Sequence, residues 1–162
     1  HVIANSDETA DQTLKKEVKD QVVTYLRSKM NQAASIQAAR QVICQEMDAL
    51  KEIAEKKIRQ EGYDYPVTVS LGTTYFPVKE YGDMAFPAGD YEALRVQIGK
   101  SKGRNWWCVM YPSLCLVDGV YQTVPENSKD KLKQVLSTSE YQSLVDGGED
   151  VQFRLRFLDW LF

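Results

Sequence analysis

One histidine and three cysteines are the only imidazole and thiol side chains in this chain of 162 residues. The cysteines, Cys44, Cys108 and Cys115, have no CxxC spacing, and a zinc site needs several nitrogen or sulfur ligands close together. We therefore expect no metal site, and no motif predicts a cofactor. An odd number of cysteines allows at most one internal disulfide and leaves at least one free thiol.

Long apolar runs and an excess of positive charge are also missing. No stretch approaches the roughly 20 apolar residues that cross a bilayer, so we expect no direct insertion into a membrane. Twenty Lys and Arg against 23 Asp and Glu give a net charge of −3, which argues against nucleic acid and anionic lipid as partners. No signal peptide is visible, but the chain opens on HVIAN, which resembles the interior of a strand. We therefore expect that preceding sequence, including an export segment, is missing.

The composition that remains is that of a folded protein. Hydrophobic residues make up 43% of the chain and aromatic residues 10%. A chain of this length buries a sizeable core without metals or many crosslinks. We predict a single domain over residues 1–162.

An apolar stripe predicts a first helix over residues 10–26, after a short strand at residues 2–4. The polar residues 5–7 can accept hydrogen bonds from the free N–H groups at the helix start. Asp11 is explained in the same way by the positive end of the helix. Lys15 falls outside the stripe and is expected to face away from the core.

A second apolar stripe predicts a helix over residues 36–58, and the two helices together form an α-hairpin. Ser35 can cap the start of this helix, and Gly62 is a natural stop. Cys44 lies next to the stripe, and we expect it to be a small, half-buried core residue.

The middle of the chain changes from helical periodicity to alternation. Residues 66–72 and 91–99 alternate with period two and predict strands, and residues 76–90 between them predict a structured loop or a pair of short edge strands. Residues 99–103, GKSKG, predict a turn and lack the residue order of a phosphate-binding loop. Residues 106–111 form a continuous apolar run, which predicts a strand covered on both faces.

The last part of the chain predicts a helix over residues 128–146 and a half-buried strand over residues 151–157. The complete order is β-α-α-β-β-β-α-β. We predict an α+β fold with a largely antiparallel sheet of about four to five strands and the two-helix hairpin packed on one face.

Cys108 is the residue that most invites an enzymatic interpretation. A nucleophilic cysteine needs a base, yet His1 is the only histidine, and burial by Trp106 and Trp107 would raise the pKa of the thiol. We therefore expect no catalytic residues. A disulfide from Cys108 to Cys115 and two reduced core thiols stay open as alternatives; a bridge of this loop size contributes about 2–3 kcal/mol in the entropy model.

Three stretches of the chain resemble one protein family. They are HVIANSD at residues 1–7, YGDMAFPAGDYEALRVQIG at residues 81–99 and NWWCVMYPSLC at residues 105–115. On these residues the chain resembles stage II sporulation protein R, a family of exported signalling proteins of endospore-forming bacteria.

The resemblance implies a function without catalysis. Members are made in the forespore and secreted into the intermembrane space between forespore and mother cell. There they activate a membrane-embedded aspartic protease, the receptor, which processes an inactive pro-sigma factor. The catalytic aspartate belongs to the receptor. Two alternatives from other classes are a thiol-dependent cell-wall hydrolase and a module that binds envelope glycans.

Rigid turns that carry aromatic residues are favoured anchors in protein interfaces. On this ground we expect the receptor to contact a surface made of Tyr81, Gly82, Phe86, Pro87, Gly89, Asn105 and Trp106.

Overall fold

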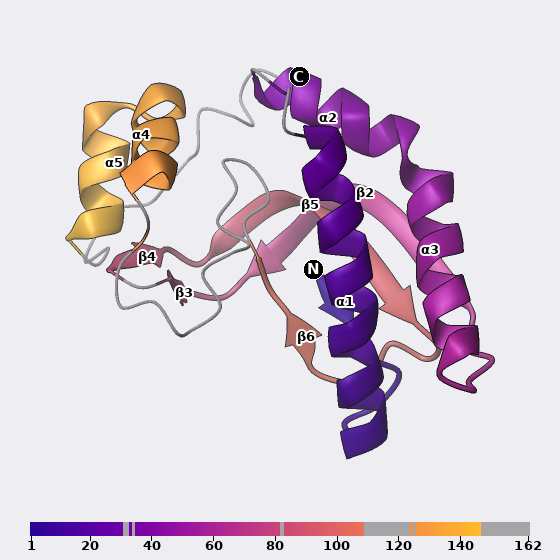
Figure 1. Cartoon of the computed structure of the whole chain (residues 1–162). Coiled ribbons are helices and arrows are strands. Elements are labelled where there is room, and N and C mark those ends of the chain that lie inside the picture. The colour runs from indigo at the N-terminus through magenta and orange to yellow at the C-terminus, as the bar shows by residue number, and fades with distance from the viewer. Residues whose placement is uncertain (31–32, 34, 82, 109–123, 125, 147–162) are drawn as a thin grey trace. The chain divides into compact units, whose positions relative to one another are not determined.

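A computed structural model describes residues 1–30, 33, 35–81, 83–108, 124 and 126–146 of the chain (Figure 1). The chain divides into two compact units. Unit 1 comprises residues 1–73 and 92–111, and unit 2 comprises residues 74–91 and 112–162. The single domain expected from the length stays a prediction.

A four-stranded sheet is built from β1 (Val2–Ile3), β2 (Val67–Phe76), β5 (Gly89–Ile98) and β6 (Asn105–Trp106), in the order β2-β5-β1-β6. Strand β1 runs parallel to β5 and antiparallel to β6, so that Val2 lies opposite both Val96 and Trp106. The mixed architecture with a mainly antiparallel sheet confirms the predicted α+β class.

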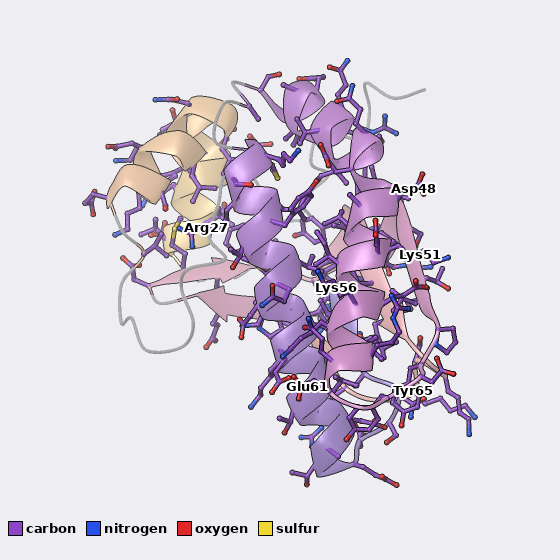
Figure 2. All side chains as sticks on the ribbon, turned by 45° about the vertical axis from the view of Figure 1, so that its right-hand side comes forward. Arg27, Asp48, Lys51, Lys56, Glu61 and Tyr65 are labelled. Carbon is purple, nitrogen blue, oxygen red and sulfur yellow. The ribbon has the colours of Figure 1, made fainter. Side chains whose placement is uncertain are left out.

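Three helices form the second layer of unit 1: α1 (Thr9–Met30), α2 (Ile36–Gln45) and α3 (Met47–Gln60). On α3, the side chains of Asp48, Lys51 and Lys56 are exposed (Figure 2).

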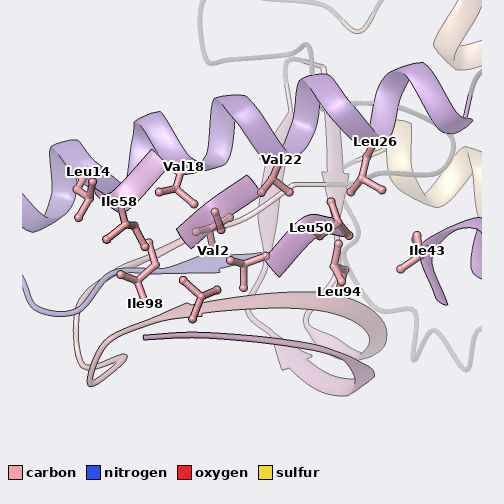
Figure 3. Close-up of a cluster of buried hydrophobic side chains, with 13 residues drawn as sticks. Val2, Leu14, Val18, Val22, Leu26, Ile43, Leu50, Ile58, Leu94 and Ile98 are labelled. Carbon is pink, nitrogen blue, oxygen red and sulfur yellow. The ribbon is translucent and has the colours of Figure 1, made fainter. Parts of the chain in front are cut away.

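The core lies between this helical layer and the sheet, and α1 and α3 lie on the same side of the strands (Figure 3). The apolar stripes of the sequence and the inward positions of the strands meet there, which is the period-matched burial that stabilises two-layer domains. The core residues are Val2, Leu14, Val18, Val22, Leu26, Ile43, Leu50, Ala54, Ile58, Val67, Leu94, Val96 and Ile98.

The predicted second helix is two helices, because the chain turns at Glu46. The Glu46 N–H still donates to Val42 and Ile43, but its carboxylate binds α1, accepting from the Tyr25 hydroxyl at 2.5 Å and pairing with the Lys29 ammonium at 3.1 Å. These contacts to α1 hold the break in place. They join residues far apart in the sequence, so the apolar periodicity alone did not reveal them.

Two other predictions for the helical layer were wrong. Cys44 is exposed, because Ala39 and Ile43 occupy the buried positions of α2. Lys15, expected to face away from the core, is buried within α1, where its ammonium bonds the backbone of a distant turn.

Unit 2 contains a hairpin of β3 (Lys79–Tyr81) and β4 (Met84–Phe86), and the helices α4 (Glu126–Val135) and α5 (Thr138–Val145). Of the two alternatives for residues 76–90, a structured loop or a pair of short edge strands, the hairpin is the second. The predicted single helix over residues 128–146 is interrupted at Ser137, whose side chain forms a capping box with Glu140 at the start of α5. The core of unit 2 includes Met84, Val124, Leu132 and Leu144.

The apolar run at residues 106–111 was predicted as one strand. Only Trp106 belongs to β6, and Trp107 and Cys108 follow it outside any strand. Residues 109–111 and the predicted strand at residues 151–157 lie outside the described residues. Within the described ranges, none of the helices combines the length and the apolar character needed to span a bilayer.

Candidate interaction surface

The residues expected to bind a receptor are divided between the two units. Tyr81, Phe86, Pro87 and Gly89 fall at the β3–β4 hairpin of unit 2 and the start of β5, and Asn105 and Trp106 form β6 of unit 1. Gly82 lies outside the described residues.

The hairpin half of this surface is tied down by hydrogen bonds within unit 2. The Tyr91 hydroxyl donates to the Pro87 carbonyl at 2.8 Å, and the Tyr91 ring meets Phe76 edge to face with centroids 5.5 Å apart. Burial raises the pKa of the Tyr91 hydroxyl. At the turn of the hairpin, Asp83 accepts from the Val124 N–H and from the Lys129 ammonium, both at 2.7 Å. The Lys129 ammonium, followed by the Val124 N–H, holds the pKa of Asp83 below its usual value.

The β6 half presents its two residues to opposite faces of the sheet. Trp106 packs against the core of unit 1, and the Lys19 ammonium lies 5.1 Å from the centroid of its ring. Successive side chains of a strand point to opposite faces, so Asn105, which lies opposite Ile3, points away from the helices. Asn105 and Trp106 therefore do not share one surface.

A polar junction joins residues 4–7 to the turn at residues 99–104 and was not predicted from the sequence. Asn5 Oδ1 accepts from the Lys100 N–H at 2.9 Å, and Asp7 Oδ1 accepts from the Arg104 N–H at 2.7 Å. Of the three polar residues predicted to cap α1, Ser6 accepts through Oγ from the N–H of Glu8, the residue before the helix, at 3.2 Å, and Asp7 Oδ1 accepts from Gln12 Nε2 in the first turn at 3.3 Å. Asn5 and Asp7 also fix the turn that leads into β6.

Two charged side chains are buried at this junction. Asp11 is 4% exposed and accepts from Asn5 Nδ2 at 2.8 Å and from Ser6 Oγ at 2.6 Å. Burial acts to raise the pKa of the Asp11 carboxyl, but hydrogen bonds from Ser6, Asn5 and Tyr65 outweigh it, and the pKa lies below its usual value.

Lys15 is 5% exposed, and its ammonium donates to the Arg104 carbonyl at 2.9 Å and to Gln12 Oε1 at 2.6 Å. Burial is the main reason that the pKa of Lys15 is lowered. A buried ammonium that bonds a backbone carbonyl 89 positions away acts as a tie between α1 and the turn.

The turn at residues 99–103, which confirms the prediction, approaches residues 4–7 too closely for side chains. A Cβ on Gly99 would lie 2.3 Å from Asn5 Oδ1, and Gly99 has φ +56°. A Cβ on Gly103 would lie 2.1 Å from the Ser6 carbonyl oxygen. The glycines flanking this turn were the sequence signal for the junction, since a close backbone approach excludes a Cβ.

Among the described residues, neither Cys44 and Cys108 nor His1 forms a recognisable catalytic group. Cys108 is disulfide-bonded, Cys44 is a free and exposed thiol, and the His1 ring stacks on Trp107 at 4.6 Å. Cys115 lies outside the described residues, so its pairing with Cys108 stays a prediction. The described residues contain no group of three or more His, Cys, Asp or Glu that could hold a metal ion.

Comparison with known proteins connects this fold to sporulation. The family model described as stage II sporulation protein R matches residues 1–121. A curated protein named Stage II sporulation protein R, from Bacillus subtilis (strain 168), is 36% identical over 130 residues, which are 80% of this chain and 58% of that protein. The chain thus spans less than two thirds of the length of this relative. No solved structure matches the chain.

We predict that Gly103→Ala destabilises the protein by more than about 1 kcal/mol, because the new Cβ must displace the Ser6 carbonyl and with it the junction. Gly72→Ala is the matched control, since a Cβ there meets nothing within 4 Å. Urea unfolding of the two variants and the parent measures the difference. Equal midpoints for the two variants would show that the close approach is unimportant for stability.

Asp11→Asn should lower the free energy of unfolding at pH 7 by about 1–3 kcal/mol. The amide brings an NH2 group, which is a donor, next to Asn5 Nδ2 and Ser6 Oγ, which already donate to this position. The folded pKa of Asp11 lies below the unfolded value, so its contribution is present above about pH 4 and is lost as the pH falls through the folded pKa. Unfolding curves at several pH values test this. The parent and the variant should converge in acid, and a difference that is independent of pH would contradict the assignment.

Proposed function

The chain belongs to the stage II sporulation protein R family, and from this membership we propose that it is a secreted signal of endospore formation. In this proposal it acts in the intermembrane space between forespore and mother cell. It binds a membrane-embedded aspartic protease there and activates it, and the protease then processes an inactive pro-sigma factor. The family match over residues 1–121 is the observation that carries the proposal.

The placement of the family-like stretches supports a role in recognition. HVIANSD forms β1 and one side of the polar junction, YGDMAFPAGDYEALRVQIG runs from the end of β3 through β5, and NWWC begins with β6. These stretches build the sheet and the hairpin. A protein that signals by binding a partner benefits from a rigid framework of this kind, because a surface that is already ordered loses less conformational entropy on binding.

We also propose that the chain itself breaks no bonds. A disulfide-bonded sulfur is no thiolate nucleophile, which removes the main argument for a thiol-dependent hydrolase at Cys108. The only histidine stacks on Trp107. The aspartate that cleaves the pro-sigma factor belongs to the receptor.

The mechanism proposed for activation is a shift of the receptor between two states. A bound protein changes such an equilibrium only through unequal affinity for the two states. The chain therefore has to bind the protease-competent state of the receptor more tightly than its idle state. Stabilising a receptor dimer is one way to achieve this.

Reconstitution tests the proposal directly. The purified chain is added outside vesicles that hold the receptor protease in the membrane, with its extracytoplasmic side outward, and the pro-sigma factor inside. We expect processing to appear with the chain and to saturate as the receptor becomes occupied. Heat-denatured chain is the control, and failure of the native chain to raise processing above that control would refute the proposed function.

Phe86→Ala tests the hairpin half of the expected surface. We predict at least about a tenfold weaker activation with the thermal midpoint changed by only a few degrees, because an aromatic anchor is lost at a rigid turn. Val145→Ala is the control, since Val145 is an exposed apolar residue of the same unit. Full activation by Phe86→Ala would remove the hairpin from the receptor contact, and unfolding would assign Phe86 to the core. Trp106 is unsuitable for this test because it packs on the core of unit 1.

A further inference from the structure

The β3–β4 hairpin of unit 2 is too short to keep its shape by strand pairing alone. Each strand has three residues, and the pairing runs from Lys79 opposite Phe86 to Tyr81 opposite Met84. An isolated two-stranded hairpin is at best marginally stable in water. The geometry of this hairpin, which carries part of the expected receptor surface, therefore depends on what the rest of unit 2 binds to it.

Met84, the first residue of β4, is the apolar anchor of the hairpin. Its side chain is 1% exposed, and β4 contacts α5. A methionine side chain has three rotatable bonds and adapts to irregular gaps in a core. Its burial therefore holds the hairpin against the helices of unit 2 but leaves the direction of the turn poorly defined.

Asp83, the residue before β4, is the polar anchor, and it uses both oxygens of its carboxylate. Oδ1 accepts from the Val124 N–H and Oδ2 accepts from the Lys129 ammonium of α4, both at 2.7 Å. Val124 is 1% exposed, and the Lys129 side chain is 15% exposed. Two bonds from one side chain to two positions of another segment fix the orientation of the turn as well as its place.

The strength of this contact suits positioning better than global stability. The Asp83 side chain is 35% exposed, and a pair with an exposed partner adds little to the free energy of unfolding. Local opening of a short hairpin needs far less free energy than unfolding of the whole chain. The bonds of Asp83 are therefore a large part of what keeps the hairpin closed.

The partners of Asp83 follow the part of the chain that matches the family. The family model covers residues 1–121, which include the hairpin, whereas Val124 and Lys129 lie after them. Residues outside the match thus hold a feature inside it.

We propose that Asp83 is a positioning residue: through its bonds to Val124 and Lys129 it holds the β3–β4 hairpin in the shape that the receptor binds. The inference rests on the proposed function and assigns α4 a part in it. A hairpin that is ordered in advance loses less conformational entropy on the receptor. If only a fraction of the chains has a closed hairpin, the apparent affinity falls in proportion to that fraction.

The first test uses the purified chain alone and measures amide hydrogen exchange. Asp83→Asn keeps an oxygen for the Val124 N–H but removes the charge, and Lys129→Met removes the ammonium. Each should speed exchange of the β3 and β4 amides by about threefold to tenfold and leave the α1 amides as in the parent. Glu126→Gln is the matched control, because Glu126 is the other carboxylate on the Lys129 ammonium, at 3.3 Å, and lies outside the hairpin. Hairpin exchange as in the parent in both folded variants would overturn the proposal.

The second test follows the same variants in the reconstituted activation assay. Asp83→Asn and Lys129→Met should each raise the chain concentration for half-maximal activation by about threefold to tenfold at an unchanged maximal rate, because the closed hairpins still bind. Lys129→Arg keeps the cation, and Glu126→Gln keeps the pair with Asp83, so both should activate like the parent. Combining the first two substitutions should weaken activation no more than the stronger one alone, since both remove the same ion pair.

A half-activating concentration that stays at the parent value, or losses that add in the combined variant, would overturn the positioning role and leave the proposed function intact. An inactive parent chain refutes the proposed function instead, and the exchange test still decides whether Asp83 orders the hairpin. Thermal midpoints within a few degrees of the parent are required of each variant, and if Asp83→Asn does not fold, Lys129→Met against Lys129→Arg makes the same comparison.

Discussion

The hydrogen bonds between residues 4–7 and the turn at residues 99–104 are the constraint on which the geometry of unit 1 depends. Strand β1 has two residues and β6 has two, so neither is held by strand pairing alone to any great extent. The hydrogen bonds of the junction hold both strands in position. Asp7 fixes the Arg104 N–H, Lys15 binds the Arg104 carbonyl, and the next residue is Asn105. The position of β6, and of every group on it, follows from a buried polar cluster at the start of α1.

This arrangement also explains why charged residues are tolerated in the interior. Asp11 and Lys15 stand one helical turn apart, and each has specific hydrogen-bond partners. Burying a charge is unfavourable unless its hydrogen bonds are satisfied, and here the partners are side chains and backbone groups that the junction must align in any case. The hydrogen bonds of Asp11 and Lys15 thus offset the desolvation of their charges, and they also select one register for β1 and β6.

Much of the fold was predictable because it depends on local pattern. Apolar periodicity placed α1 and the strands β2 and β5, and the glycines and prolines between those strands predicted the β3–β4 hairpin. The failures share one physical cause, which is contact between distant residues. Glu46 breaks a helix because it binds Tyr25 and Lys29, and Lys15 is buried because Arg104 offers it a carbonyl.

The candidate surface was harder to predict for the same reason. Aromatic content suggested Asn105 and Trp106 together, but strand alternation separates them, and the residues that lie beside Asn105 across the sheet come from β1 and β5.

In the proposed function this protein acts by occupancy, because it favours one state of its receptor while it is bound. Removal of the chain after activation tests that claim most directly. Receptor vesicles are activated, the chain is washed away, and protease activity on fresh pro-sigma factor is followed over time. Occupancy predicts a return to the basal rate at the speed with which the chain dissociates. Activity that persists after the chain has left would mean that the chain had changed the receptor covalently, and activation by occupancy would be wrong.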